Sequence, residues 1–360
     1  MTNALIAGDG PAGLAAAIIL GQLGKTVTVV RRPMNEQHIR AGESLASSAL
    51  LSLTELGLSA EFLAAGHEPC YGNSSCWGND KLSYYDFIQS TLGNSWYIDR
   101  QKLHAMLYNK AIECRVSFIT AGRTVSLEKD DDIWHYHTGN GNEPIAARMI
   151  VDASGRNSWF SRRLGIERVT DDKQIAAITL LATEQPVRSH HSIVEAVKDG
   201  WWYVAGTGND KTVCIFFTDA DLHKRGDLAD PAYLDNLKKE TRFVKHRVAA
   251  QHYRLLMQPQ LTAAASSHLS RFSGPGWIAA GDAACAMDPV SAHGIAFALR
   301  SGIDAAIAAN DVLNGTHADC ALYDEQLHLA MDIYKEQRRN IYRKECRWPA
   351  AVYWKRRRQA

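Results

Sequence analysis

The sequence lacks several features that would assign it to a specialised class of protein. Its seven cysteines include no C-x-x-C pair and no regular spacing, which argues against a disulfide framework and a structural metal site. No stretch is long and apolar enough to span a bilayer, and no basic segment precedes the first apolar run. The net charge of only +1 argues against a general nucleic-acid-binding protein. These absences predict a cytoplasmic protein with free thiols, no metal, no membrane anchor and no signal peptide.

The composition is that of a globular protein larger than one ordinary domain. The chain has 360 residues, of which 46% are hydrophobic and 22% are charged. A single hydrophobic core seldom organises so many residues. We therefore expect two domains, or one domain with a large insertion.

The beginning of the chain predicts a dinucleotide-binding unit. The first apolar strand is expected at Ala4–Ala7, and it is followed by the glycine pattern G-x-G-x-x-G at Gly8, Gly10 and Gly13. An apolar helix at Leu14–Leu23 and a second apolar strand at Val27–Val30 come next. In such a unit one glycine allows the tight turn, one lets the backbone approach a diphosphate, and one lets the helix pack against the sheet. The diphosphate then lies at the helix N-terminus.

One feature of this unit departs from the usual pattern. The second strand should end in an acidic residue that binds the adenosine ribose. This chain has Arg31 and Arg32 there, and the nearest acid is Glu36. An arginine at this point could hold the 2′-phosphate of NADP, or lie along the adenosine diphosphate of a flavin. The glycine turn alone leaves both ligands open.

Two later stretches also have turns at the ends of apolar strands. Residues 150–158 run from a strand into Asp152 and Gly155, and residues 276–284 contain a strand that ends in Gly281 and Asp282. Ligands of open α/β sheets bind at such carboxyl ends. The loop at residues 288–294 leads into an expected helix from Ile295 to about Leu313, whose N–H groups and positive dipole end would face an electron-accepting ring.

The middle of the chain has a different pattern. Residues 71–96 are rich in aromatic side chains, which more often form core than a substrate pocket, and residues 175–217 alternate as in strands, with Gly200-Trp201-Trp202-Tyr203 at their centre. We expect an antiparallel domain inserted into the first one. A helix is expected over residues 45–56, with Ser44 either as its plain N-cap or as part of the site.

The three turns, in this order and at these separations, resemble those of the FAD-dependent aromatic hydroxylases of the para-hydroxybenzoate hydroxylase fold. The resemblance covers residues 1 to about 315 and implies an α/β fold, in which a Rossmann-type FAD-binding domain carries an inserted antiparallel-sheet substrate domain and C-terminal helices. The implied FAD-binding domain comprises residues 1–70, 97–165 and 262–315. The substrate domain comprises 71–96 and 166–261, and the tail comprises 316–360.

The resemblance also implies the residues of the site. FAD would be bound by Gly8, Gly10, Pro11, Ala12, Gly13, Arg31, Arg32, Arg40, Ser44, Arg100, Gly281, Asp282, Pro289, Ala292, His293, Gly294 and Ile295. Trp201, Trp202 and Tyr203 would face the substrate, and His293 or Glu43 would handle protons. The family's loop usually reads Pro-Leu-Ser-Gly-Gln-Gly, whereas this chain has Val290, Ala292 and His293, which would put an imidazole beside the flavin.

Within that fold, the chain looks most like the branch that contains tryptophan halogenases and the flavoprotein maturases of quinone-cofactor enzymes. Gly42-Glu43-Ser44 is similar to the segment of this branch over the flavin, and Glu195-Ala196, Gly200-Trp201-Trp202-Tyr203 and Arg347-Trp348-Pro349 are similar to the maturases. The resemblance implies hydroxylation of a tryptophan in a precursor protein of a cysteine tryptophylquinone enzyme, such as glycine or lysine oxidase or a quinohemoprotein amine dehydrogenase. Dioxygen and electrons from NAD(P)H or another external reductant would be consumed.

Two alternatives remain at this point. A flavin-dependent halogenase would resemble Gly-Trp-x-Trp-x-x-Pro and need a lysine, but the tryptophans here are adjacent, no proline follows, and Lys81 is the one candidate lysine. The other alternative is a non-catalytic flavoprotein that acts as a chaperone or electron carrier.

The C-terminal tail is basic and aromatic. From Arg338 onward nine basic residues are opposed only by Glu345, with tyrosine and tryptophan between them. Such a run predicts either an ordinary solvated face or a docking patch for an acidic protein partner.

Overall fold

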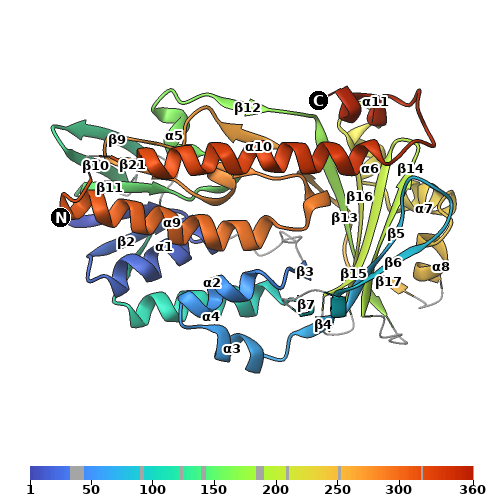
Figure 1. The fold of residues 1–360 in the computed structure, drawn as a ribbon, viewed down its shortest axis with the longest axis horizontal. Helices are drawn as coiled ribbons and strands as arrows, with labels where there is room; N and C mark the ends of the chain where they lie inside the picture. The colour runs from blue at the N-terminus through green and yellow to red at the C-terminus, as the bar shows by residue number, and fades with distance from the viewer. Residues whose placement is uncertain are drawn as a thin grey trace.

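The computed structural model describes residues 1–32, 44–89, 93–121, 125–138, 143–183, 190–207, 211–249, 253–317 and 319–359. Within these ranges the molecule is elongated, with one β-sheet toward each end (Figure 1). Two long helices, α9 (Gly294–Asn314) and α10 (Ala321–Arg343), run along its length. The predicted α/β fold with an inserted antiparallel sheet is confirmed.

The first sheet is built around the N-terminal strand. β1 pairs in parallel with β11 and β2, and the order β20-β21-β11-β1-β2-β8 is extended by β10 and β9 beside β11. Its strands are β1 (Thr2–Ala7), β2 (Val27–Arg31), β8 (Ser117–Thr120), β9 (Val125–Asp130), β10 (Ile133–Thr138), β11 (Ile145–Asp152), β20 (Ser273–Gly274) and β21 (Trp277–Ala279). Of the parallel strands, β1, β21 and the second half of β11 are almost wholly buried, as expected for the centre of a sheet covered by helices on its faces, whereas β8 at the edge is partly exposed.

Helices of the first domain pack closely on one another. The helices α1 (Pro11–Gln22), α4 (Arg100–Glu113) and α9 are in contact, with α1 between the other two. A Cβ added to Gly302 of α9 would lie 2.3 Å from the carbonyl oxygen of Ala12, so the two helix backbones approach more closely than any larger residue allows. This contact fixes the start of α1 against the middle of α9.

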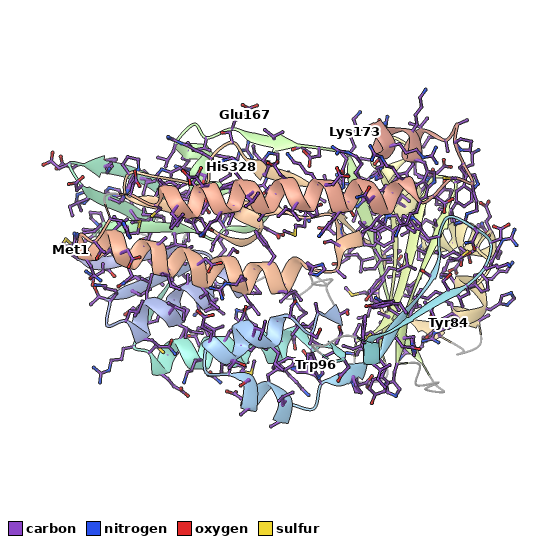
Figure 2. All side chains as sticks on the ribbon, viewed as in Figure 1. Met1, Tyr84, Trp96, Glu167, Lys173 and His328 are labelled. Carbon is purple, nitrogen blue, oxygen red and sulfur yellow. The ribbon has the colours of Figure 1, made fainter. Side chains whose placement is uncertain are left out.

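The second sheet is mostly antiparallel and is buried on both faces. Its order is β17-β13-β16-β15-β14-β5-β6, with β18 beside β13. The strands are β5 (Gly72–Cys76), β6 (Ser83–Asp86), β13 (Gln174–Thr183), β14 (His191–Val197), β15 (Gly200–Gly206), β16 (Lys211–Asp219), β17 (Tyr253–Leu255) and β18 (Gln260–Ala263). Tyr84 on β6 marks its exposed outer edge (Figure 2).

One face of the second sheet is covered by short helices. Leu228, Leu234 and Val244 of α6 (Arg225–Leu228), α7 (Pro231–Lys239) and α8 (Val244–Ala249) pack against it. Glu195 is buried in β14 and accepts hydrogen bonds from the backbone N–H groups of Phe243 and Val244, at 2.9 and 2.8 Å. This glutamate therefore caps the N-terminus of α8 and has a structural role.

Smaller elements connect the two sheets. They are β3 (Ser44–Leu45), α2 (Ala49–Glu55), α3 (Ser59–Ala64), β4 (Glu68–Cys70), β7 (Ser95–Tyr97), α5 (Trp159–Arg163), β12 (Arg168–Thr170), β19 (Ser267–Leu269) and β22 (Cys285–Ala286), with one-turn helices at Phe87–Gln89, Gly155–Asn157, Gly281–Ala283 and Pro289–Ser291. The helix expected over residues 45–56 begins only at Ala49. Ser44 lies in β3, opposite Tyr97, so it is not the N-cap of that helix.

Part of the basic tail is buried, while Arg343, Lys344 and Lys355 are exposed. Helix α11 (Val352–Gln359) follows α10, and Tyr342, Tyr353, Trp354, Arg338 and Arg357 are all buried. The arginines form ion pairs with acids that lie far away in the sequence, such as Asp219 with Arg357. The docking-patch interpretation is therefore wrong for these residues, because their charges are neutralised inside the molecule.

Candidate functional site

The first glycine turn is shaped by backbone contacts. Gly8 has a φ of +117°, and an added Cβ would lie 2.3 Å from the carbonyl oxygen of Ala153. A Cβ on Gly13 would lie 2.0 Å from the carbonyl oxygen of Gly8. Gly10 is the N-cap of α1, and a Cβ there would meet nothing within 4 Å. Gly8 and Gly13 are thus needed for packing, whereas Gly10 leaves open space in front of the helix N-terminus.

The second turn is held by a buried carboxylate at the end of β11. Asp152 accepts hydrogen bonds from the N–H and hydroxyl of Ser154, at 3.1 and 2.6 Å, and from those of Ser161, at 2.8 and 2.7 Å. Asp152 therefore has a structural role, which is to fix the backbone that carries Gly155 and Arg156. These two residues line the cavity described below.

The third turn brings Asp282 to an arginine. Gly281 has a φ of +60° and approaches Ala12 so closely that a Cβ would lie 2.7 Å from the Ala12 side chain. The guanidinium of Arg156 lies 3.4 Å from the carboxylate of Asp282. Arg168 donates to the Asp282 carbonyl oxygen at 2.9 Å; burial lowers the pKa of Arg168, and Asp282 partly offsets this.

The loop before α9 begins at a buried aspartate. Asp288 accepts a hydrogen bond from the N–H of Val290 at 3.0 Å, which caps the one-turn helix Pro289–Ser291. Ala292 is in the left-handed conformation with a φ of +54°, and His293 is the N-cap of α9. The side chain of His293 makes no capping hydrogen bond to α9, and a Cβ on Gly294 would meet no described atom within 4 Å. Gly294 and Ile295 at this helix end line the cavity described below.

A cavity of about 600 Å³ joins these turns to the second sheet. Ten of the predicted FAD-binding residues line it: Gly10, Pro11, Ala12, Ser44, Arg100, Asp282, Pro289, Ala292, Gly294 and Ile295. Arg100, at the start of α4, and Arg156 bring positive charge to a cavity that also receives the N-terminus of α1. This combination fits a bound diphosphate, which needs N–H donors, cations and room for close approach.

Other predicted residues lie away from the cavity wall. Gly8, Gly13 and Gly281 support it from behind through the close contacts above. Arg31 donates to the Thr120 hydroxyl at 3.3 Å and Arg32 is exposed, so neither is on the wall. Arg40 and Glu43 lie outside the described residues.

His293 is also off the wall. Its side chain is exposed, and its Nδ1 contacts the carbonyl oxygen of Ser291. Ala292 before it is in the left-handed conformation, and His293 is not among the described residues that line the cavity. The role of His293 in proton handling stays a prediction.

The second sheet forms the far wall of the cavity. Trp201 and Tyr203 of β15 line it, and Trp201 stacks on Phe217 with ring centroids 4.0 Å apart. Trp202 points to the opposite face of the sheet, where it stacks on Phe216 in the core under α6, α7 and α8. Side chains alternate along a strand, so Trp202 cannot share the face of its two neighbours. The prediction that Trp202 faces the substrate is corrected on this ground.

Sequence reasoning missed several lining residues. Asn73 and Ser192 lie on adjacent strands β5 and β14, with the Ser192 hydroxyl donating to the Asn73 side-chain oxygen, and Phe217 lies on β16. The alternation of side chains along a strand could have predicted Phe217, because Phe217 and Ile215 are two residues apart on an apolar strand and therefore lie on the same face. Nothing in the sequence pairs β5 with β14, which are more than a hundred residues apart, so Asn73 had no comparable signal.

The match to a family model is consistent with this fold and site. The model is described as an FAD binding domain and matches residues 1–344. The chain therefore belongs to this family of FAD-binding proteins, and it is an FAD-dependent enzyme.

Individual relatives narrow the comparison. LodB of Marinomonas mediterranea, which carries the name FAD-dependent oxidoreductase, is 30% identical over 99% of this chain and 96% of LodB. The myxobacterial chondrochloren halogenase CndH has a TM-score of 0.85 at 21% identity, covering 99% of this chain and 85% of that one. The peptidyl tryptophan dihydroxylase QhpG, essential for tryptophylquinone cofactor biogenesis, has a TM-score of 0.77 at 22% identity, covering 99% and 78%. At such identities the two structures show a shared fold.

The helices were also compared with the requirements for crossing a bilayer. Among the described residues no helix combines the length and the apolar character that a bilayer crossing requires.

Proposed function

We propose that this protein is an FAD-dependent monooxygenase that hydroxylates a tryptophan side chain of a precursor protein during tryptophylquinone cofactor biogenesis. The observation that carries the proposal is the cavity, which runs from the glycine turn to an aromatic wall of Trp201, Tyr203 and Phe217. The full-length similarity to LodB and the fold shared with QhpG support it.

The proposed site divides into a cofactor part and a substrate part. The N-terminus of α1 at Gly10, together with Arg100, would hold the FAD diphosphate, and Asp282 would bind hydroxyl groups of the cofactor. The loop from Pro289 to Gly294 would face the flavin ring. These assignments stay predictions.

The chain's own residues would orient the substrate and keep water out. Reduced FAD supplies the chemistry, which is activation of dioxygen for transfer of an oxygen atom to an electron-rich ring. The stacked Trp201 and Phe217 offer a flat apolar surface to an indole, and the nearby Asn73 and Ser192 offer polar groups to a peptide backbone. A buried wall of this kind limits the access of water to the reaction. Electrons would come from NAD(P)H or another external reductant.

A halogenase is the second candidate, favoured by the fold shared with CndH. Lys81 is exposed on a turn, where its N–H donates to the side chain of Asn79 at 2.8 Å, and it does not line the cavity. In the part of the chain that the structure describes, the cavity wall carries arginines and no lysine. This favours oxygenation over halogenation.

The test uses the FAD-loaded protein, a reductant and a co-purified candidate precursor. The reaction is run in isotopically labelled dioxygen, once in a halide-free buffer and once with bromide, and peptides of the precursor are mapped by mass spectrometry. We expect a tryptophan to gain labelled oxygen under both conditions, and Lys81→Met to leave the yield unchanged. Bromine on tryptophan, and no oxygen without halide, would refute the proposal.

A further inference from the structure

The loop in front of the proposed flavin ring is held from behind by helix α10. Asp288 is fully buried and lies on the cavity wall. Its carboxylate accepts hydrogen bonds from Arg338 Nε at 3.1 Å and from the Tyr342 hydroxyl at 2.9 Å. Its backbone N–H donates to the Tyr334 hydroxyl at 2.6 Å. Residues 334, 338 and 342 are spaced by four, so they lie on one face of α10, and this face forms hydrogen bonds to the start of the loop.

A second layer ties the same aspartate to helix α11. Gln174 donates from Nε2 to Asp288 at 3.1 Å. The side-chain oxygen Oε1 of Gln174 accepts hydrogen bonds from the Tyr353 hydroxyl at 2.6 Å and from Arg357 at 2.9 Å. Arg357 also pairs with Asp219 at 2.8 Å. The loop, the second sheet and the C-terminal tail therefore share one buried hydrogen-bond network.

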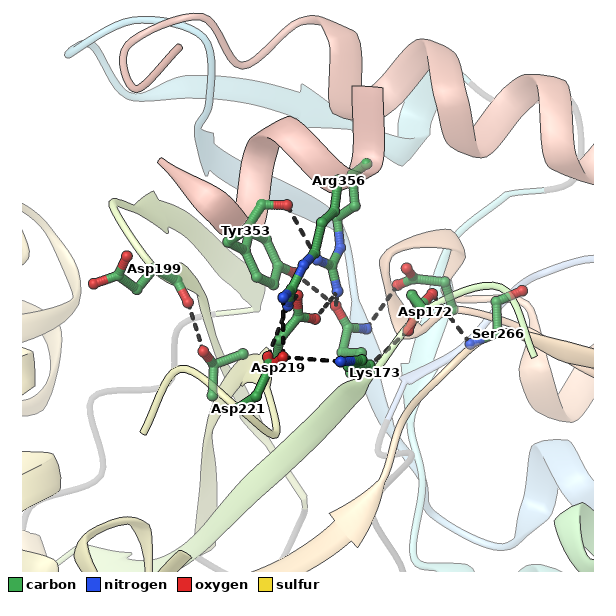
Figure 3. Close-up of polar contacts among 12 residues, drawn as sticks. Asp172, Lys173, Asp199, Asp219, Asp221, Ser266, Tyr353 and Arg356 are labelled. Carbon is green, nitrogen blue, oxygen red and sulfur yellow. Dashed lines mark hydrogen bonds and ion pairs between the residues drawn. The ribbon is translucent and has the colours of Figure 1, made fainter. Parts of the chain in front are cut away.

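The periphery of this network is anchored at the surface. Figure 3 shows Tyr353 and Arg356 of α11 close to Asp219, at the end of β16. Arg356 donates to Asp219 at 2.9 Å and to Asp221 at 2.7 Å. Asp221 pairs in turn with Lys173 at 3.0 Å. The outer pairs hold α11 in place, while the inner ones reach the cavity.

In the buried part of this network, one arginine faces two carboxylates. Arg338 pairs with both Asp288 and Asp172, and the side chains of all three residues are at most 7% exposed. Burial and the neighbouring Asp288 raise the pKa of Asp172, against the effect of Arg338. Burial alone would lower the pKa of Arg338, but Asp288, Tyr342 and Asp172 together raise it above its ordinary value. A buried carboxylate that loses its cation exerts a strong field, because little solvent screens it.

We propose that Arg338 and Tyr342 are positioning residues for the flavin: through Asp288 they fix the Pro289–His293 loop against the ring, and Arg338 neutralises the carboxylate behind it. Reduction adds negative charge to the ring, and an unneutralised Asp288 opposes that charge. The pair thus keeps the reduction potential of FAD higher than it would be with Asp288 alone. The inference rests on the proposed position of the flavin ring, and it does not depend on which substrate is oxidised.

The test compares Arg338→Met and Tyr342→Phe with Arg343→Met, a matched control on the exposed side of the same helix. The readouts are the midpoint potential of bound FAD by dye equilibration, the Kd for FAD, and the melting temperature of the apoprotein. Arg338→Met lowers the potential and weakens FAD binding, and Tyr342→Phe shifts both in the same direction by less. Arg343→Met changes neither.

A double variant separates charge from packing. Arg338→Met with Asp288→Asn removes the cation and the carboxylate on the cavity wall, and leaves Asp172 as the remaining acid of the group, so the potential returns part of the way toward that of the wild type even though the hydrogen bonds are lost. If Arg338→Met does not fold, Tyr342→Phe decides, because it removes one hydroxyl and no charge. Wild-type potential and affinity in Tyr342→Phe, or a lower melting temperature without any change of potential in Arg338→Met, would overturn the inference. All readouts are taken without substrate, so failure of tryptophan hydroxylation would not be mistaken for failure here.

Discussion

Three glycines of the first turn differ in what a side chain would meet. Gly8 and Gly13 face backbone atoms at 2.3 and 2.0 Å from an added Cβ, and Gly10 faces open space. Gly10 also has an ordinary φ of −73°, which any residue adopts. Packing explains the first two glycines, and the open third position leaves room for the close approach of a ligand.

The first prediction follows from this difference. Gly10→Val folds with nearly the wild-type melting temperature. Its side chain fills the open space and keeps the diphosphate from the backbone N–H groups, and losing one such hydrogen bond to a charged phosphate costs about 1.5–3 kcal/mol, so the Kd for FAD rises at least tenfold. Equilibrium titration with FAD and a thermal melt of the apoprotein check this. Gly13→Val is the contrast, since its Cβ collides with the carbonyl oxygen of Gly8 and should abolish soluble protein. Normal FAD affinity in folded Gly10→Val would place the diphosphate elsewhere.

At the scale of the element, strand β15 separates two adjacent tryptophans. Trp201 lies on the cavity face and Trp202 in the core beneath the short helices. Both side chains are buried, so burial alone does not tell them apart.

The second prediction tests this separation. Trp202→Phe leaves a gap in a closed core and lowers the free energy of unfolding by about 1–3 kcal/mol, with little effect on precursor affinity. Trp201→Phe removes part of the surface offered to the indole and raises the KM for the precursor severalfold. Urea unfolding and precursor titration measure the two effects, with each variant as the control for the other. Equal changes in KM for both would contradict the assignment of faces.

Local patterns in the sequence predicted the elements and turns well, because each depends on neighbouring residues. The glycine turn, the strand ending at Asp282 and the loop at residues 288–294 were found in this way, and their convergence on one cavity came from the resemblance. The face of Trp202 was missed because aromatic residues occupy both sets of alternating positions in Trp201-Trp202-Tyr203. Only the neighbouring strands decide which set faces the cavity. The exposed position of His293 had no signal in the sequence, because it depends on the backbone conformation of the loop, which is left-handed at Ala292.

The burial of two arginines of the basic tail could not be predicted, for another reason. Arg338 and Arg357 are paired with Asp172, Asp288 and Asp219, which precede them by at least fifty residues. A run of charge in a sequence does not show which distant acids will meet it. The division into domains and the roles of the FAD-binding residues stay predictions.

At the scale of the whole molecule, three partly buried histidines link stability to pH. Burial lowers the pKa of His67, His223 and His268 from the ordinary value of 6.5. The unfolded chain therefore binds protons more readily than the folded one at these sites. Their contribution to stability is complete above about pH 6.5 and is lost as the pH falls through the lowered folded-state pKa values.

The third prediction is that the free energy of unfolding falls between about pH 7.5 and about pH 5.5. Replacing His223 and His268 together with glutamine reduces this slope, since two of the three groups no longer titrate. His317→Gln, at an exposed position, serves as the control and keeps the wild-type slope. Urea unfolding at several pH values measures it. A stability that rises as the pH falls would show that other groups dominate.

The central claim is that one cavity holds the flavin of an FAD-dependent enzyme against an aromatic wall. A crystal structure of the FAD-loaded protein tests it most directly. We predict the diphosphate at the N-terminus of α1 beside Gly10, and the flavin ring between the Pro289–Ile295 segment and the wall of Trp201 and Tyr203. A ring bound away from that segment, with the wall unreachable from it, would contradict the account.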